Sequence, residues 1–193
     1  MAKILLIILL PIITMTSCLA QNNKFGLSAG IGSGAIIKKP LDGDATYKLN
    51  TGFSVGLQYE RKIKESLYVQ TGLNWYKNSV NVTPSFYPGN DISAKSYDIS
   101  LLTLPIFVRV EVSKYIYLNG GLLTDFDISN NKYLANQSGI GAGIGIGTEL
   151  LQSHKMSLRI NPFLNFHSLI LFEKETYPER IFDAGIQLSI MIK

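Results

Sequence analysis

Between residues 139 and 147 every second residue is glycine, and isoleucine or alanine fills the positions between. Successive side chains of a β-strand point to opposite faces, so this segment predicts a strand with one apolar face and one nearly bare face. Interior glycine weakens an ordinary strand, whereas a small closed barrel can use it because its interior is crowded. The repeat therefore favours a closed β-barrel.

The same period of two, less pure, runs along the rest of the chain and predicts eight strands. Most of them exceed the roughly 9–11 residues that a tilted strand needs to cross a bilayer. We therefore expect an all-β fold, an eight-stranded antiparallel up-and-down transmembrane β-barrel. The expected strands are residues 24–37, 49–60, 67–82, 97–112, 115–128, 138–150, 155–169 and 182–193.

The connections between these strands alternate in length. The short ones fall near residues 61–66, 113–114 and 152–154, and most of the others are longer, as at residues 38–48 and 83–96. Outer-membrane barrels have short periplasmic turns and longer extracellular loops. The alternation predicts that the long connections face the cell exterior.

Periodicity alone does not say which face of the barrel points outward. A soluble, lipocalin-like barrel also has eight alternating strands, with its apolar face inside, and it is the alternative. Only 17% of the residues are charged, against roughly a quarter in soluble domains. The polar faces are mostly Gly, Ser, Asn and Gln, and the apolar faces are almost free of charge. These features favour a barrel whose apolar face meets lipid.

The N-terminus has the pattern of an export signal. Lys3 precedes an apolar run over residues 4–13, and small residues follow up to Ala20. We expect residues 1–20 to be a cleaved signal peptide and residues 21–193 to be the barrel domain of the bacterial outer membrane. An imperfect lipobox over residues 15–18 leaves lipidation of Cys18 as the alternative.

Three segments carry a family resemblance. Residues 104–109 read Leu-Pro-Ile-Phe-Val-Arg, residues 117–121 read Tyr-Leu-Asn-Gly-Gly, and residues 67–73 read Leu-Tyr-Val-Gln-Thr-Gly-Leu. They resemble the fourth, fifth and third strands of the Bacteroidetes outer-membrane β-barrel family, the PorT-like barrels. The resemblance implies an eight-stranded outer-membrane barrel. It also offers a second role for the chain, as a component of an envelope secretion machine.

Charged residues also occur on the face assigned to the barrel interior, in its periplasmic half. Burying an isolated charge is costly, so such groups should pair. We expect a structural ion-pair network that fills a packed polar lumen, with a proton or ion path as the alternative. The residues of the expected network are Glu60, Arg109, Glu111, Glu149 and Arg159.

A second polar group is expected near the extracellular mouth. A histidine, an acid and a hydroxyl can form a nucleophilic triad, so a lipid-modifying enzyme is a further alternative. No motif joins these residues, and the two histidines lack metal-ligand spacing. We therefore expect no enzyme activity, no metal and no cofactor. The residues of this group are His167, Asp125, Asp127, Ser129 and Ser168.

The long connections hold aromatic residues that could contact a partner. Loops on a rigid scaffold commonly carry binding, although aromatic side chains can equally lie along lipid headgroups. The basic residues are scattered, which argues against nucleic acid. We expect a monomer in outer-membrane lipid with a structural or binding role through its loops, and an envelope protein is the expected class of partner. The candidate contacts are Tyr47, Phe86, Tyr87, Tyr133 and Tyr177.

Overall fold

The computed structural model describes residues 23–38, 45–84, 93–129, 135–153, 155–173 and 179–192. Within these ranges the chain forms nine strands, and no helix there is long and apolar enough to cross a membrane. The expected signal peptide, residues 1–20, lies outside the described residues. The strands are β1 (Asn23–Ile37), β2 (Thr46–Leu49), β3 (Gly52–Lys64), β4 (Leu67–Thr83), β5 (Lys95–Glu111), β6 (Ile116–Asp127), β7 (Gly139–Gln152), β8 (Met156–Leu171) and β9 (Arg180–Ile192).

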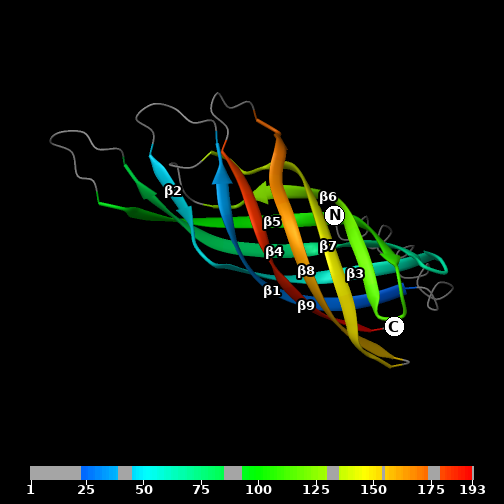
Figure 1. Ribbon diagram of the computed structural model, residues 1–193. Coiled ribbons are helices and arrows are strands. Elements are labelled where there is room, and N and C mark those ends of the chain that lie inside the picture. The colour runs from blue at the N-terminus through cyan, green and yellow to red at the C-terminus, as the bar shows by residue number, and fades with distance from the viewer. Residues whose placement is uncertain are drawn as a thin grey trace, which may run out of the picture.

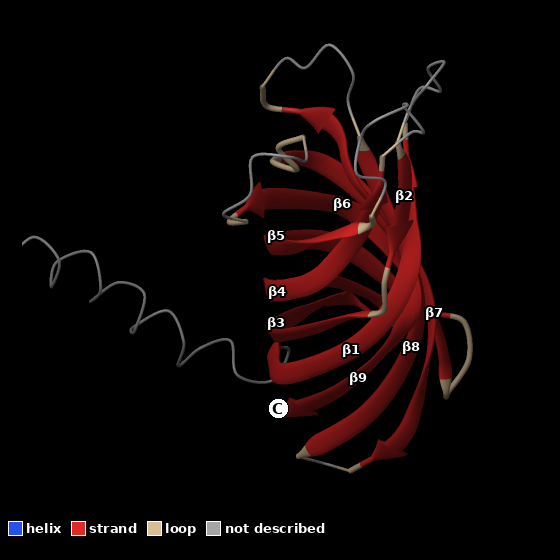
Figure 2. Cartoon of the chain, turned by 90° about the vertical axis from the view of Figure 1, so that its left-hand side faces the viewer, coloured by secondary structure: helices blue, strands red, loops and turns tan. Residues whose placement is uncertain are grey.

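The sheet closes on itself. Each strand from β3 to β9 pairs antiparallel with its neighbour in sequence, and β1 joins β3 to β9. The ring therefore contains the eight antiparallel up-and-down strands that the sequence predicts. They run steeply tilted and side by side (Figure 2). In Figure 1, β4 and β5 extend past the ring at one end, which we call the long-loop end, and the opposite end, where β3 meets β4, is the short-turn end.

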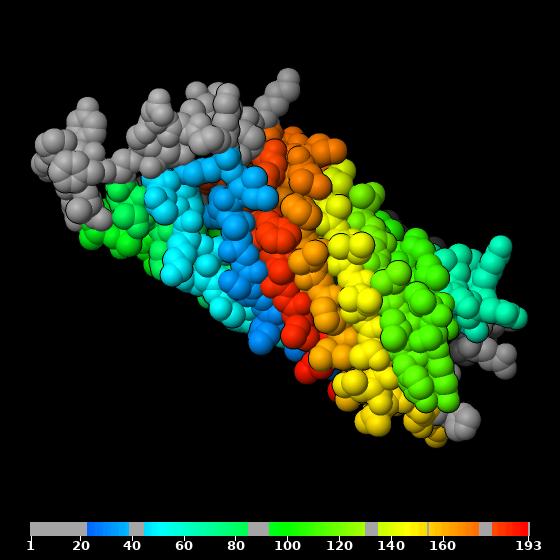
Figure 3. All heavy atoms as spheres, viewed as in Figure 1, coloured from blue at the N-terminus to red at the C-terminus, as the bar shows by residue number. Residues whose placement is uncertain are grey.

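The apolar faces point outward. Leu27, Ile31 and Ile144 are 60–65% exposed, although they lie in the middle of strands, while the polar residues between them are largely covered. On the side shown in Figure 3, side chains of β1, β9, β8 and β7 form a continuous wall. An exposed apolar belt of this extent is the surface that a barrel presents to lipid.

The glycine face of β7 is explained by what stands opposite it. Tyr117 of β6 pairs with Gly147, and Asn119 pairs with Gly145. A Cβ atom on Gly147 would lie 2.1 Å from the Tyr117 ring, and one on Gly143 would lie 2.7 Å from the Phe107 ring. The bare face thus accommodates large side chains of neighbouring strands that fill the narrow interior.

We expect Gly147→Val to destabilise the barrel by about 1–3 kcal/mol, the usual cost of overpacking. Tyr117 is only 3% exposed, so its ring has little room to retreat. Chemical unfolding of the protein in lipid vesicles measures the change. Gly120→Ala is the control, because the nearest atom to its new Cβ lies at 3.2 Å. Equal stability of the two variants would contradict this account of the glycine repeat.

The structure differs from the expectation in the first long connection. Residues 46–48, expected as part of the connection, form β2 together with Leu49, which was expected to begin the second strand; β2 pairs with β4 beyond the end of β3. Tyr47 therefore lies on a strand, where its ring packs 3.9 Å from the Lys38 ammonium group. Pairing with β4 lets this short segment extend the sheet along the projecting part of that strand.

The interior is also less uniformly polar than expected. At the long-loop end, inward positions of the projecting strands carry apolar side chains that form a buried group, here called the mouth cluster. Each is at most 5% exposed. The expectation of a polar lumen therefore fails at this end, because the projecting parts of β4 and β5 carry apolar side chains on the inward face and polar ones, such as Lys77 and Asp98, on the outward face. The cluster consists of Leu49, Tyr76, Val80, Ile99, Leu101 and Ile181.

Candidate functional site

The five residues of the expected ion-pair network come together inside the short-turn half of the barrel. They lie on β3, β5, β7 and β8, and Lys24 of β1 joins them. Cross-strand register places two of the contacts directly, since Glu149 lies opposite Arg159 and Lys24 lies opposite Glu60. We call this group the charged cluster: Lys24, Glu60, Arg109, Glu111, Glu149 and Arg159.

Glu60 is the centre of the charged cluster. Arg159 donates hydrogen bonds to both of its carboxylate oxygens, at 2.8 and 3.1 Å. Arg109 lies against the same carboxylate, with its Nε atom 2.9 Å from Oε2 and its Nη2 atom donating to Oε1 at 3.2 Å. The Lys24 ammonium group is 3.7 Å from Oε1. One buried carboxylate thus contacts three cations.

The outer members of the cluster complete the balance of charge. Glu149 accepts from Arg159 Nε at 2.8 Å, and Glu111 accepts from Arg109 Nη2 at 3.0 Å. The Arg109 guanidinium also stacks 4.0 Å from the centre of the Tyr68 ring. Glu60, Arg109 and Arg159 are at most 1% exposed, so side chains fill the barrel at this level. Such a network links side chains of five strands across the interior.

The expected group near the mouth is brought together only in part. His167 Nδ1 lies 3.1 Å from Asp125, and Nε2 lies 2.9 Å from Asp183, a residue that the sequence reasoning did not select. The doubly protonated ring is the form that donates to both carboxylates. The imidazole stacks under Tyr76 of the mouth cluster, with ring centres 5.6 Å apart. We call Asp125, His167 and Asp183 the histidine group.

A bulge in β8 shapes this group. Gly141 of β7 faces three residues of β8, and Ser168 there has a positive φ of 51°. The bulge turns both His167 and Ser168 inward, where the Ser168 amide donates to Asp125 at 3.3 Å. The Ser168 hydroxyl donates to the Gln137 carbonyl, away from the imidazole. Because both ring nitrogens face carboxylates, His167 is not placed to activate a serine.

The other two residues of that expected group lie at the rim. Asp127 accepts hydrogen bonds from the backbone amides of Ser129 and Gln137, at 2.8 and 2.9 Å. The Ser129 hydroxyl in turn accepts from the Ser100 amide at 2.8 Å. These contacts tie together the ends of β5, β6 and β7. Asp127 and Ser129 therefore order the rim of the barrel.

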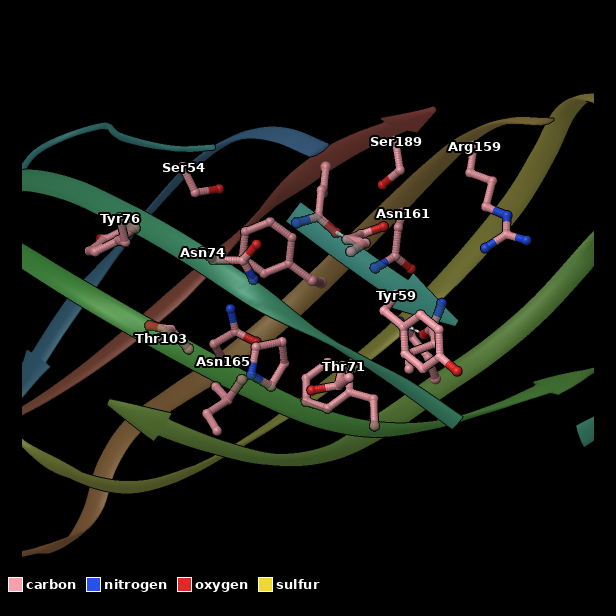
Figure 4. Close-up of a pocket in the computed structure, with 18 of the residues that line it drawn as sticks. Ser54, Tyr59, Thr71, Asn74, Tyr76, Thr103, Arg159, Asn161, Asn165 and Ser189 are labelled. Atoms are coloured by element: carbon pink, nitrogen blue, oxygen red, sulfur yellow. Dashed lines mark hydrogen bonds between the residues drawn. The ribbon is translucent and has the colours of Figure 1, made fainter. Parts of the chain in front are cut away.

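A cavity of about 80 Å³, lined by both polar and apolar side chains, separates the charged cluster from the histidine group. In Figure 4, Ser54, Asn74, Thr103, Asn161, Asn165 and Ser189 converge on it from different strands. Arg159 lies at one end, and His167 and Asp183 lie at the other. A single water needs roughly 10–15 Å³ of such space, so the cavity has room for several small polar species.

Of the candidate loop contacts, only Tyr47 falls within the described residues, on β2. Phe86, Tyr87, Tyr133 and Tyr177 lie outside them.

The sequence analysis did not select Lys24 and Asp183. The signal that could have identified them is strand parity, the alternation of inward and outward positions along a strand. Lys24 and Asp183 both share the inward parity of residues that the sequence analysis placed in the lumen.

Comparisons with known proteins give one family and several similar folds. A profile of the family described as "Outer membrane protein beta-barrel domain" matches residues 19–193. The solid-state NMR structure of the outer membrane protein AlkL in DMPC lipid bilayers is similar, with a TM-score of 0.52 and 8% identity over 89% of this chain and 91% of that one. No curated protein matches the sequence significantly.

Two further solved structures match with lower TM-scores. The translocator domain of the autotransporter NalP from Neisseria meningitidis has a TM-score of 0.35 and 8% identity, over 93% of this chain and 94% of that one. The NanC porin has a TM-score of 0.31 and 8% identity, over 88% and 99%. The likeness to AlkL supports the fold.

Proposed function

The chain belongs to the outer membrane protein β-barrel domain family, and on that premise we propose that it is a non-conducting barrel that binds a partner at its long-loop end. One observation carries the proposal. The charged cluster fills the interior near the short-turn end, and the mouth cluster fills it near the other end. A barrel filled in this way acts as an anchor for what it displays rather than as a pore.

The long-loop end is the part of the molecule built for display. There β4 and β5 project beyond the ring, and β2 widens them into a three-stranded extension (Figure 1). The ends of β1, β4, β6 and β8 that lead into the longer connections also lie at this end, and outer-membrane barrels direct such connections to the cell exterior. Because the mouth cluster packs beneath the extension, the displayed surface rests on a rigid base.

Planar-bilayer recording tests the proposal. We expect the purified protein to insert without stable conductance steps, because buried side chains of the charged cluster occupy the section that an ion would have to cross. A porin reconstituted in the same lipid is the positive control. Reproducible single-channel steps from the unmodified protein, absent from a mock preparation, would refute a non-conducting barrel.

The resemblance to PorT-like barrels supports a more specific version, in which the partner is another protein of an envelope secretion machine. It rests on residues 67–73, 104–109 and 117–121. All three segments lie in strands, so they support the architecture more directly than the partner. Co-purification of a defined envelope protein after mild detergent extraction favours this version, and a monomer that carries only lipid argues against it.

We further propose that the chain is not an enzyme. The contacts of His167 support this, since both ring nitrogens are taken by carboxylates and the nearby Ser168 hydroxyl donates elsewhere. Lipid turnover unchanged by His167→Ala agrees with this part of the proposal.

Export through a cleaved signal peptide over residues 1–20 is also a proposal. The intact mass of the membrane-extracted protein tests it.

A further inference from the structure

The short turns carry an excess of exposed positive charge. The turns between β3 and β4, between β5 and β6, and between β7 and β8 lie at the same end of the barrel (Figure 1). None of their exposed charged side chains forms an ion pair within the described part of the chain. These side chains are Arg61, Lys62, Lys64, Glu65, Lys114 and Lys155, so five cations stand against one carboxylate.

One of these turns borders a shallow pocket on the outer side of the barrel. Lys64, Glu65, Ser66, Leu67 and Val110 line it. Leu67 and Val110 lie opposite each other in the register of β4 with β5, and Val110 is 42% exposed. The floor of the pocket is therefore part of the apolar wall.

An apolar strip leads from this pocket into the wall. Val69 and Val108 also lie opposite each other, two residues further along β4 and β5, and both are exposed. Leu67, Val69, Val108 and Val110 thus form one outward surface, which we call the apolar strip. Because the strip is continuous with the face that meets lipid, its occupant must itself lie in the membrane.

Two cations of β3 stand beside the apolar strip. Arg61 lies opposite Val69, and a register shift between Lys62 and Lys64 places Lys64 opposite Leu67. Both cationic side chains are exposed. The long stems of arginine and lysine can lie on apolar surface while their charged ends reach the headgroup level. The arrangement is amphipathic in the same sense as a phospholipid, with cations at the turn and apolar surface below them.

We propose that this pocket binds an anionic phospholipid, whose phosphate contacts Arg61 and Lys64 and whose acyl chain lies on the apolar strip. Short turns of outer-membrane barrels face the periplasm, so the lipid belongs to the periplasmic leaflet. Glu65 is the one carboxylate of the lining, and the excess of cations at this end favours an anionic headgroup over a zwitterionic one. The site lies at the opposite end from the surface proposed to bind a partner, so either proposal can fail without the other.

Native mass spectrometry of the intact protein in detergent tests the headgroup preference. Phosphatidylglycerol and phosphatidylcholine with identical acyl chains are titrated separately, so that only the headgroup differs. We expect the apparent Kd for the first phosphatidylglycerol molecule to be at least fivefold lower than that for phosphatidylcholine. Equal affinities overturn the proposal.

A pair of double variants separates the pocket from a general effect of charge. Arg61→Gln with Lys64→Gln should reduce the preference for phosphatidylglycerol to less than twofold. Lys48→Gln with Lys95→Gln removes the same charge from exposed positions of β2 and β5 at the long-loop end, and it should keep the preference. Heat-modifiable gel migration verifies that both variants are folded. An equal loss of preference in the two double variants overturns the proposal.

Solid-state NMR of the labelled, unmodified protein places the lipid without relying on any variant. Spectra are compared in bilayers of phosphatidylcholine alone and with about one third phosphatidylglycerol. We expect the signals of Lys64, Leu67 and Val110 to shift, while those of Lys48 and Lys95 stay unchanged. The absence of a shift at all three pocket residues overturns the proposal.

Discussion

Replacing Glu60 by glutamine should destabilise the barrel by about 3–5 kcal/mol, the cost of breaking a buried ion pair by removing one partner. Glu60 is 1% exposed and contacts Lys24, Arg109 and Arg159. Its loss leaves three cations with only Glu111 and Glu149, although Arg109 and Arg159 are at most 1% exposed. Chemical unfolding in lipid vesicles measures the change.

Glu111→Gln is the matched control, because it removes the same charge from the same cluster. The Glu111 side chain is 29% exposed, and among the described cations it pairs with Arg109, besides a hydrogen bond with Tyr68, so we expect a cost of about 1 kcal/mol, well below that of the Glu60 variant. Adding Lys24→Met to the Glu60 variant should restore part of the lost stability, since one of the unpaired cations disappears. Equal losses of stability in the two glutamine variants would contradict the assignment of Glu60 as the centre of the charged cluster.

Replacing Ile144 by arginine should cost about 2–4 kcal/mol, because a charge on the lipid face of a barrel is most expensive near the bilayer midplane. Ile144 lies near the middle of β7 and is 60% exposed, so the arginine meets no protein atoms that it must displace. On a water-facing surface the same change would stay within about 0.5 kcal/mol. Unfolding in vesicles measures this effect too.

Ile116→Arg provides the comparison. Ile116 is also exposed, at 46%, but it is the first residue of β6 at the short-turn end. Near the bilayer interface the cost should fall to about 0–1 kcal/mol. A larger loss of stability for Ile144→Arg than for Ile116→Arg would show that Ile144 lies deeper in the bilayer. Small and equal losses would mean that water, not lipid, surrounds the outer face of the barrel.

Much of this architecture is predictable from the sequence. The predicted strand over residues 67–82 corresponds to β4 (Leu67–Thr83), and that over residues 155–169 corresponds to β8 (Met156–Leu171). The pattern is clear there because each residue faces either lipid or the interior. It failed for β2, whose four residues are too few to show a period and are held mainly by pairing with β4.

The candidate site was predictable to a smaller extent. Strand parity placed Glu60, Arg109 and Arg159 inside, and the cost of burying charge implied that they pair. Parity could not show that Asp183, rather than a serine, completes the contacts of His167. That choice depends on the bulge at Ser168, which turns two successive side chains inward and breaks the period of two. The cavity between the charged cluster and the histidine group was not predicted, because the residues that line it lie on separate strands and share no local pattern.

The alternation of apolar and small residues predicted a closed barrel, because a strand has two faces and each must match its surroundings. The low share of charged residues, 17%, predicted that the apolar face meets lipid. What meets across the interior was decided only by the closed sheet. Glu60, Arg109 and Arg159 come from strands far apart in sequence, and the register of eight strands brings them within hydrogen-bond distance. The sequence thus determines the faces strand by strand, whereas closure of the ring determines the contacts between them.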